Sequence, residues 1–452
     1  MTVLTPLSER GEVGISSRPT MPAEPTTLRY MTRFRCIAER CEDTCCGGLR
    51  VPVSEAQWTR MRATVAGHPE ETERLYQLVL PNQGGAPTEH AFIEMRPDGY
   101  CPFLDTQKLC SLQRRHGDAV LPDICATFPR VVTTWGERVE VSGTLACPEV
   151  ARLCLLEEDA VESDSMPSEL QHAFRPESAR HIPLHEEDAY AFHAETVRAA
   201  MLRLLGRREY PLASRLALLG QLAYALDGFY FRGTESFRGE ERAGAIARLT
   251  EVLQRFESPD VLDEGHRDFT ALALPGGPCV GLFTSVLKRL AAGRGERFTT
   301  LVRGVLESLP LGAGGPGELD TAWRSYVERW QGLEASHGER VHQYFHNYAV
   351  HHLWRSPFTD APSLLAYVFR LVLRVGLLRL TLVGHPRVAE FLHAPASTPE
   401  AREQLDRAAV ETFQLVAKHV EQAPDFLSLA EGLVGPGRGG DALGKVLIFA
   451  TF

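Results

Sequence analysis

The cysteines constrain this chain more than any other feature. Eight of its ten cysteines lie in one N-terminal stretch, and four of those fall between residues 36 and 46. Thiolates that converge on one point are typical ligands of zinc or of an iron–sulfur cluster. The sequence therefore predicts a metal-binding module. Its candidate ligands are Cys36, Cys41, Cys45, Cys46, Cys101, Cys110, Cys125 and Cys147.

A disulfide framework is the alternative explanation for such a pattern, beside buried or redox-active thiols. Disulfide frameworks are typical of short secreted chains, whereas this chain has 452 residues. Residues 1–20 carry neither a basic segment nor an apolar segment of a secretory leader. A bond between the neighbours Cys45 and Cys46 would also be strained. We therefore favour metal ligation and expect a cytoplasmic protein, whose thiols stay reduced.

The number of metal sites stays open at this point. Eight thiolates exceed the four that a tetrahedral zinc ion or a cubane cluster needs. Two sites are possible, and so is one site accompanied by structural cysteines. Cys147 is a weaker candidate than the others, and Cys154 and Cys279 are interpreted as buried thiols without metal.

Composition excludes two classes of protein. The net charge of -10 argues against a nucleic-acid binder, which would carry a basic face. Residues 363–383 are apolar enough to raise the question of a membrane span, but they contain Arg370, Arg374 and Arg379. Each arginine near a bilayer centre costs about 2.5–3.5 kcal/mol. This segment is predicted to be a buried helix, and no membrane span is expected.

Four regions are predicted along the chain. Residues 1–26 are expected to form a disordered tail, 27–160 the cysteine-rich module, 161–185 an acidic linker and 186–452 an α-helical domain. The fold class is thus mainly α, with a small β-hairpin in the module. The helices expected from apolar spacing are 189–205, 211–226, 245–256, 281–292, 322–333, 341–354, 364–383 and 401–422.

Two local patterns in the module are specific. Ser54 followed by Gln57 predicts a capping box at a helix start. Residues 130–147 predict a β-hairpin that turns near Trp135 and Gly136. Alternation along the returning strand places Cys147 on the same face as Val141.

The second half of the cysteine set forms a series of spaced motifs. Together with the first cluster it resembles the flagellin lysine N-methylase family, and a broader cysteine-cluster domain proposed to chelate zinc or iron. The likeness extends from Phe34 to about Leu156 and continues more faintly in His346–Tyr348 and Trp354–Phe358. The motifs that carry it are Gly99–Asp105, Leu109–Cys110, Asp123–Arg130 and Leu145–Glu149.

The resemblance implies methyl transfer from S-adenosylmethionine to the ε-amino groups of lysines on a protein, with flagellin as the family's named substrate. The residues alone do not show this activity, since no G-x-G-x-x-G turn follows a convincing strand. The spacing of Cys36, Cys41 and Cys45 also departs from the C-x3-C-x2-C of radical enzymes that use this cofactor. A radical mechanism is therefore unsupported, although another spacing can still hold a cluster.

Tyr348, beside Asn347, is the catalytic candidate. A lysine methylase must remove a proton from the ammonium group and align the amine with the methyl group, and a tyrosine can assist the first step. The alternative is a core aromatic residue on an amphipathic helix. His342 and His346 have a spacing that can place two imidazoles on one metal ion. Without an H-E-x-x-H pattern, we favour solvated or hydrogen-bonded histidines here, including His351 and His352.

The leading hypothesis is a metal-containing protein lysine N-methyltransferase that acts on a protein with exposed lysines. The alternative is a non-enzymatic zinc or iron–sulfur protein whose helical domain docks a partner, and a third possibility is a redox enzyme. Methyl transfer to a protein would exclude the second hypothesis. Reversible bleaching of a visible absorbance would favour the third.

Overall fold

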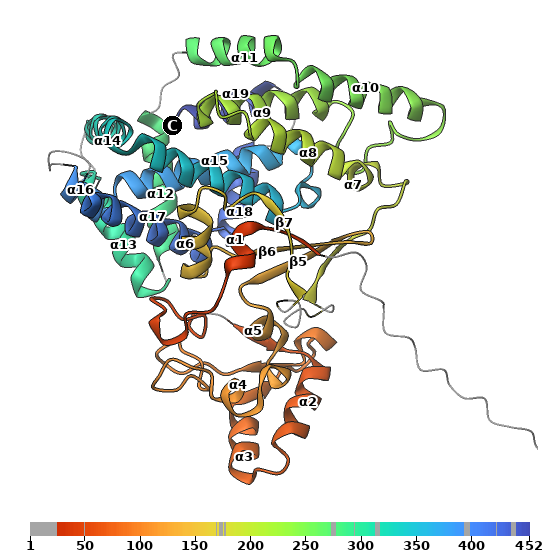
Figure 1. The fold of residues 1–452 in the computed structure, drawn as a ribbon, viewed down its shortest axis with the longest axis vertical. Coiled ribbons are helices and arrows are strands. Elements are labelled where there is room, and N and C mark those ends of the chain that lie inside the picture. The colour runs from red at the N-terminus through yellow and green to blue at the C-terminus, as the bar shows by residue number, and fades with distance from the viewer. Residues whose placement is uncertain are drawn as a thin grey trace, which may run out of the picture.

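The computed structural model places a small cysteine-bearing module at one end of a larger, mainly helical body (Figure 1). Residues 1–24 of the predicted tail lie outside the described residues. The residues described are 25–48, 50–168, 170, 175, 178–272, 277–292, 294–311, 317–392, 398–421, 423–434 and 440–452.

Short elements build the module. It contains a three-stranded antiparallel sheet, in the order β2-β4-β3, and a pair of helices, α2 and α3, that pack against each other. The capping box is confirmed, because Ser54 Oγ accepts from Gln57 N and Gln57 Oε1 accepts from Ser54 N, both at 3.2 Å. The elements are β2 (Val51–Val53), α2 (Glu55–Val65), α3 (Pro69–Leu78), β3 (Val79–Pro81), β4 (Ala91–Ile93), α4 (Ser111–His116) and α5 (Asp123–Thr127).

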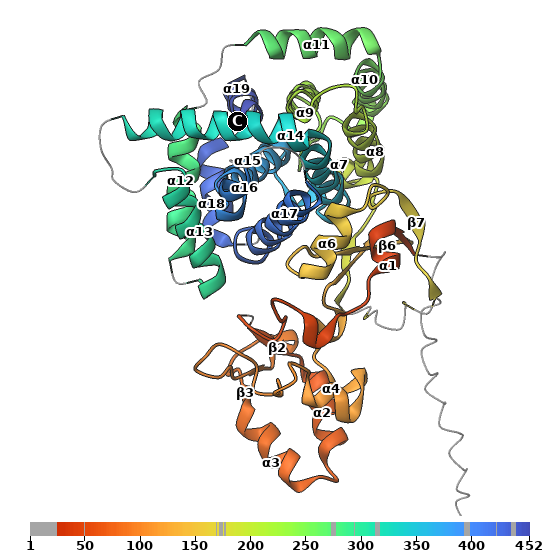
Figure 2. The ribbon, with the colours of Figure 1, turned by 60° about the vertical axis from the view of Figure 1, so that its left-hand side comes forward.

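A five-stranded sheet joins the module to the helical body. Its order is β7-β1-β6-β5-β8, and the segment interpreted as an acidic linker supplies two of its strands. Figure 2 shows this sheet between the module and the helices. The elements here are β1 (Thr26–Leu28), α1 (Arg29–Arg33), β5 (Arg130–Trp135), β6 (Arg138–Gly143), α6 (Pro148–Leu156), β7 (Ser163–Ser165) and β8 (Arg180–Ile182).

The predicted hairpin is confirmed, with Trp135 paired to Arg138 across its turn. The placement of Cys147 on the returning strand is wrong. Strand β6 ends at Gly143, and Cys147 instead occupies the N-cap position of α6. Pro148 explains the difference, since it lacks a backbone N–H and its fixed φ suits the first position of a helix.

The remainder is helical, which confirms the mainly α fold class. Two predicted helices merge into α14, with a kink at His337, and the helix predicted over 189–205 is divided at His193. The helices are α7 (Ala189–Phe192), α8 (Ala194–Leu205), α9 (Leu212–Asp227), α10 (Arg242–Arg255), α11 (Pro259–Ala271), α12 (Gly277–Ala291), α13 (Glu296–Ser308), α14 (Glu318–Arg355), α15 (Leu364–Val383), α16 (Pro386–Phe391), α17 (Pro399–His419), α18 (Pro424–Val434) and α19 (Gly440–Thr451).

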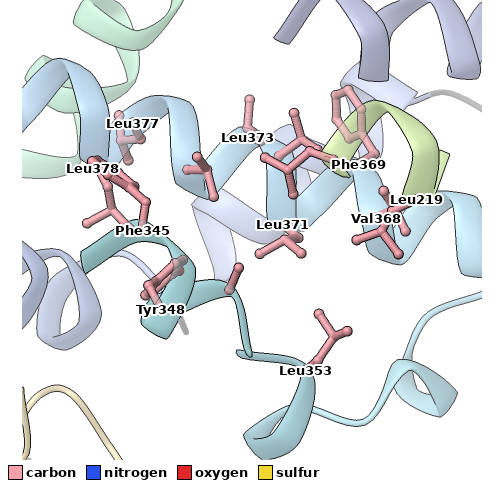
Figure 3. Packing of buried hydrophobic residues seen from close by; sticks show 14 of the residues in the cluster. Leu219, Phe345, Tyr348, Leu353, Val368, Phe369, Leu371, Leu373, Leu377 and Leu378 are labelled. Carbon is pink, nitrogen blue, oxygen red and sulfur yellow. The ribbon is translucent and has the colours of Figure 1, made fainter. Parts of the chain in front are cut away.

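Helix α15 is the centre of this body. It packs against α9, α14, α17 and α19, and its side chains are buried around the whole circumference (Figure 3). That environment explains its apolar sequence, because a helix surrounded by other helices needs no polar face. Within the described part of the chain, no helix combines the length and apolar character that crossing a membrane requires.

The described hydrophobic residues form two main cores and a small third cluster of Val141, Met166 and Leu170. The larger core unites the helical body with α1, α6 and the five-stranded sheet, and includes Tyr30, Trp135 and Val150. The smaller core lies within the module, around Met61 and Phe103. Residues 27–160 therefore contribute to both main cores. Among the predicted thiol ligands, Cys147 belongs to the larger core, whereas Cys101 belongs to the smaller one.

Candidate metal centre and adjoining cleft

Five of the predicted ligands line one small cavity in the module, of about 80 Å³. Apart from Gln113, its other walls are apolar and include Leu121 from the loop before α5, Ile124 from α5 and Phe128 after it. Elements far apart in sequence bring these thiols together at the edge of the smaller core. The five are Cys45, Cys46, Cys101, Cys110 and Cys125.

Backbone pairing explains how the first cysteine cluster meets the second. Cys101 N donates to Cys46 O at 2.7 Å, and Gly47 and Tyr100 form an antiparallel bridge. Gly48 continues this turn with a φ of 73°, a conformation that favours glycine. The adjacent pair Cys45 and Cys46 is thereby held against the second half of the cysteine set.

The electrostatics of this cavity favour a positively charged guest. A hydrogen bond from the Cys45 thiol lowers the pKa of Cys46 to about 7, and the same interaction raises the pKa of Cys45. Burial raises the pKa of Cys101 to about 11, and it also raises the pKa of Cys125, with nearby Cys46 adding to the effect. Ionisation of one thiol thus disfavours ionisation of its neighbours, and a bound cation would stabilise several thiolates at once.

The other three predicted ligands form a second group outside this cavity. Burial raises the pKa of Cys147 to about 12, and the neighbouring thiolates of Cys41 and Cys36 raise it further. Burial also raises the pKa of Cys41, to which Cys36 is again a neighbour. The eight thiols are therefore divided into five around the cavity and three beside it.

Metal binding itself remains a prediction. Among the residues that the structure describes, no three or more His, Cys, Asp or Glu side chains adopt an arrangement ready to hold a metal ion. The donor set nevertheless fits soft-metal chemistry, because five thiols share one cavity with apolar walls. Cys154 and Cys279 are buried in the larger core, as expected for thiols without a metal.

A cleft of about 600 Å³ adjoins the three-thiol group. It lies between the loop that follows Cys41 and helices α6, α13, α16 and α17, and its size is that of a small-molecule site. Four arginines and four carboxylates balance one another along its walls. The lining residues are Glu42, Pro148, Arg152, Leu156, Arg297, Arg387, Glu403, Asp406, Arg407, Val410, Glu411 and Gln414.

Sequence reasoning missed this cleft. The side chains that line it come from five segments, and those on α13, α16 and α17 belong to no recognisable motif. The signal that was available is indirect: Glu42 and Pro148 each follow a predicted ligand directly. A site next to Cys41 and Cys147 could have been expected on that ground alone.

Tyr348 lies inside the larger core, on α14 (Figure 3), and the neighbouring Asn347 is fully buried. Tyr348 donates to Glu421 Oε1 at 2.9 Å, and burial raises the pKa of its hydroxyl. Asn347 Nδ2 donates to the carbonyl oxygens of Cys154 and Glu157, both at 2.9 Å. Since neither side chain reaches the surface, the contacts they make are those of residues that hold helices together. Their catalytic role stays a prediction.

Three histidines of α14, at positions 342, 346 and 351, lie in different environments. His342 is exposed and lies 3.4 Å from Glu334, whereas His346 is buried with its Nδ1 3.0 Å from Arg215 NH1. His351 Nδ1 contacts the Tyr30 hydroxyl at 3.0 Å. Burial lowers the pKa of both His346 and His351 to about 3. These contacts agree with the interpretation of solvated and hydrogen-bonded histidines.

Comparison with known proteins adds a family and three relatives. The model of the FliB lysine N-methylase C-terminal domain matches residues 198–448. A lysine-N-methylase of Salmonella typhimurium is 29% identical over 138 residues, which is 30% of this chain and 33% of the relative. The flagellar biosynthetic protein FliU of Salmonella muenchen is 27% identical over 150 residues, which is 33% of this chain and 86% of the relative.

A lysine-N-methylase of Salmonella choleraesuis is 28% identical over 138 residues, again 30% of this chain and 33% of the relative. The chain thus spans about a third of the length of the two lysine-N-methylases that it matches. No solved structure matches the chain.

Proposed function

This chain belongs to the FliB lysine N-methylase family, and from that membership we propose that it is a protein lysine N-methyltransferase with a metal-binding cysteine module. The match of residues 198–448 to the family model carries the proposal of lysine methylation. The alternative of a non-enzymatic metal protein is not favoured, because two relatives are named lysine-N-methylases.

Within this proposal, the five-thiol cavity is the main metal centre. Thiolates in an apolar setting suit zinc or an iron–sulfur cluster, and Cys46 already has a thiol pKa of about 7. The cytoplasm would keep these thiols reduced. The catalytic role predicted for Tyr348 and Asn347 stays part of the proposal, and their complete burial means that a substrate could reach them only after the helices around them move.

The cleft is the proposed place of reaction. When bound, S-adenosylmethionine supplies an electrophilic methyl group. Glu403 and Glu411 place negative charge where a lysine ammonium group can be attracted. A hydrogen bond with His385 lowers the pKa of Glu411, and Arg297 and Arg387, at 3.4 and 3.9 Å, add to that effect. The cleft's balanced charges and its volume of about 600 Å³ fit a zwitterionic donor.

The proposed substrate is a protein with exposed lysines, and flagellin is the first to test. The name of one relative, a flagellar biosynthetic protein, supports that choice. Methyl transfer from S-adenosylmethionine to purified flagellin, followed by mass mapping of the methylated lysines, tests it directly. A lysine-rich protein without any link to flagella is the comparison substrate.

Metal and acid-labile sulfide contents, measured with a visible spectrum on protein purified without oxygen, test the metal centre. The Cys46→Ser, Cys125→Ser double variant should lose the metal and the methyl transfer. Cys279→Ser is the matched control, because that thiol is buried in the larger core and should be dispensable. Unchanged metal content in the double variant would refute the cavity as the metal centre, and no transfer to either protein would refute the proposed activity.

A further inference from the structure

Asp43 connects the first cysteine cluster to the helical body. It lies between Cys41 and Cys45, and its side chain is only 14% exposed. Its Oδ1 accepts from Lys418 Nζ at 2.8 Å and its Oδ2 accepts from Gln414 Nε2 at 2.8 Å. Both partners belong to α17, more than 370 residues further along the chain.

Gln414 extends this connection to the third thiol of the group. Its Nε2 also donates to Ala146 O, at 3.0 Å, and Ala146 directly precedes Cys147. The side chain is buried, with 1% exposure. One amide group on α17 therefore holds the loop that carries Cys41 and the segment that carries Cys147.

Two more contacts fix the same loop. Arg297 of α13 lies 3.5 Å from Asp43 Oδ2, and Arg152 of α6 forms an ion pair with Glu42. Moving the loop away from α17 would leave buried hydrogen-bonding and charged groups without their partners, which is costly. The position of the loop is thus determined by the helical body as well as by the module.

We propose that Asp43 is a positioning residue, which holds the loop of Cys41 and Cys45 against Gln414 and Lys418 of α17 and so assembles the three-thiol group at the edge of the cleft. This inference rests on the proposed function, because the position of these thiols has a functional consequence only if they bind a metal. The contacts to Asp43 themselves do not depend on a bound metal.

Two further consequences follow for the cleft. Glu42 and Gln414 both line it, so the docked loop also forms part of its wall. Releasing the loop would open that wall and separate Cys41 from Cys147.

Thiol alkylation of metal-free full-length protein, mapped by mass spectrometry, tests the proposal without any metal. Asp43→Asn and Lys418→Met should each speed the alkylation of Cys41 several-fold, while Cys279 reacts at an unchanged rate. Asp441→Asn is the matched control, since Asp441 pairs with Lys445 at 2.7 Å on an exposed helix face. Equal alkylation of Cys41 in all variants would overturn the proposal.

A double-mutant cycle sharpens the result. If Asp43 and Lys418 act as one pair, the combined variant should alkylate no faster than either single variant, whereas multiplied rates would overturn the pairing. Zinc affinity is the second readout, and the loss of an outer partner of this kind typically lowers metal affinity about 10–100-fold. Unchanged affinity beside faster alkylation would overturn the positioning role.

Hydrogen exchange of the unmodified protein tests the docked loop without any substitution that could disturb folding. The amide of Cys41 donates to Ala38 O at 3.0 Å and that of Cys46 to Thr44 Oγ1 at 3.2 Å. Both amides should exchange slowly in the metal-free state, and rapid exchange there would overturn the docked loop. The two proposals can fail separately. A wild-type protein that binds no metal contradicts the metal centre, while alkylation and exchange still decide whether Asp43 fixes the loop.

Discussion

The module and the helical body are stabilised in different ways. The helical body is built around α15, whose side chains are buried on every side, and its core extends into the five-stranded sheet. The module has three-residue strands, short helices and a much smaller core around Met61 and Phe103. Small cores of this kind usually need a cross-link or a metal ion. The comparison leads to a prediction: apolar burial suffices for the helical body, whereas the module should also need a metal held by its thiols and the docking contacts of Asp43.

The largest effect is expected from a cavity in the helical core. Phe369 is fully buried on α15, and its ring lies 5.7 Å from that of Phe449. Phe369→Ala should lower the free energy of unfolding by about 3–5 kcal/mol, because lost burial and an unfilled cavity add up. Urea unfolding followed by far-ultraviolet circular dichroism measures this change.

Tyr224→Ala is the control for that substitution, because Tyr224 is 44% exposed on α9. Its cost should stay within about 0.5 kcal/mol. The comparison also requires that Phe369→Ala leave the alkylation of Cys41 unchanged under native conditions. Faster alkylation of Cys41 in the Phe369 variant would mean that a cavity in the helical core alters the structure of the module. The two regions would then not be stabilised independently.

An intermediate effect is expected from pH, through buried histidines of the helical body. Burial lowers the pKa of His346 and His351 to about 3, whereas unfolded histidine titrates near 6.5. The unfolded chain therefore binds more protons between these values, so stability is lost as the pH falls from about 6.5 toward 3. Well below pH 6.5, each histidine should cost about 1.4 kcal/mol per pH unit.

Urea unfolding at about pH 7 and about pH 5 measures this slope. His351→Asn should reduce this slope by the contribution of one titrating histidine. The asparagine amide can still form a hydrogen bond with the Tyr30 hydroxyl. An unchanged slope in that variant would show that His351 does not titrate as its burial implies. Alkylation of the module's thiols cannot report this effect, since it depends on pH for its own reasons.

The sequence predicted those features whose causes are local. Helix α15 runs from Leu364 to Val383 as expected, because apolar residues dominate the segment between the cap at Ser363 and the helix end at Gly384, with only three arginines among them. The capping box at Ser54 and the hairpin turn after Trp135 were also predictable from neighbouring residues. In each case a few adjacent side chains or backbone angles decide the outcome.

Features that depend on distant contacts could not be predicted. The error at Cys147 is different, because its cause is local: alternation suggested that the strand continues to Cys147, but the adjacent Pro148 starts a helix there. The helical spacing of Tyr348 was correct, yet spacing does not say whether a face meets solvent or another helix. Asp43 and its partners Gln414 and Lys418 belong to no motif, since their contacts exist only after the chain has folded.

The smallest effect compares the same chemical change in both regions. Ser54 caps α2 in the module, and Thr398 caps α17 in the helical body by accepting from Ala401 N at 3.1 Å. Replacing either residue with alanine should cost about 1 kcal/mol, since each change leaves a helix N–H without its partner. The equal cost makes the two variants a matched pair.

Their consequences should differ, because the module has a smaller core to absorb the loss. Ser54→Ala should increase limited proteolysis within the module of metal-free protein and leave the main unfolding transition almost unchanged. Thr398→Ala should shift that main transition and leave the module's proteolysis as it was. If both variants shift one common transition equally, the module and the helical body unfold as a single unit, and the docked loop of Asp43 is the contact best placed to join them.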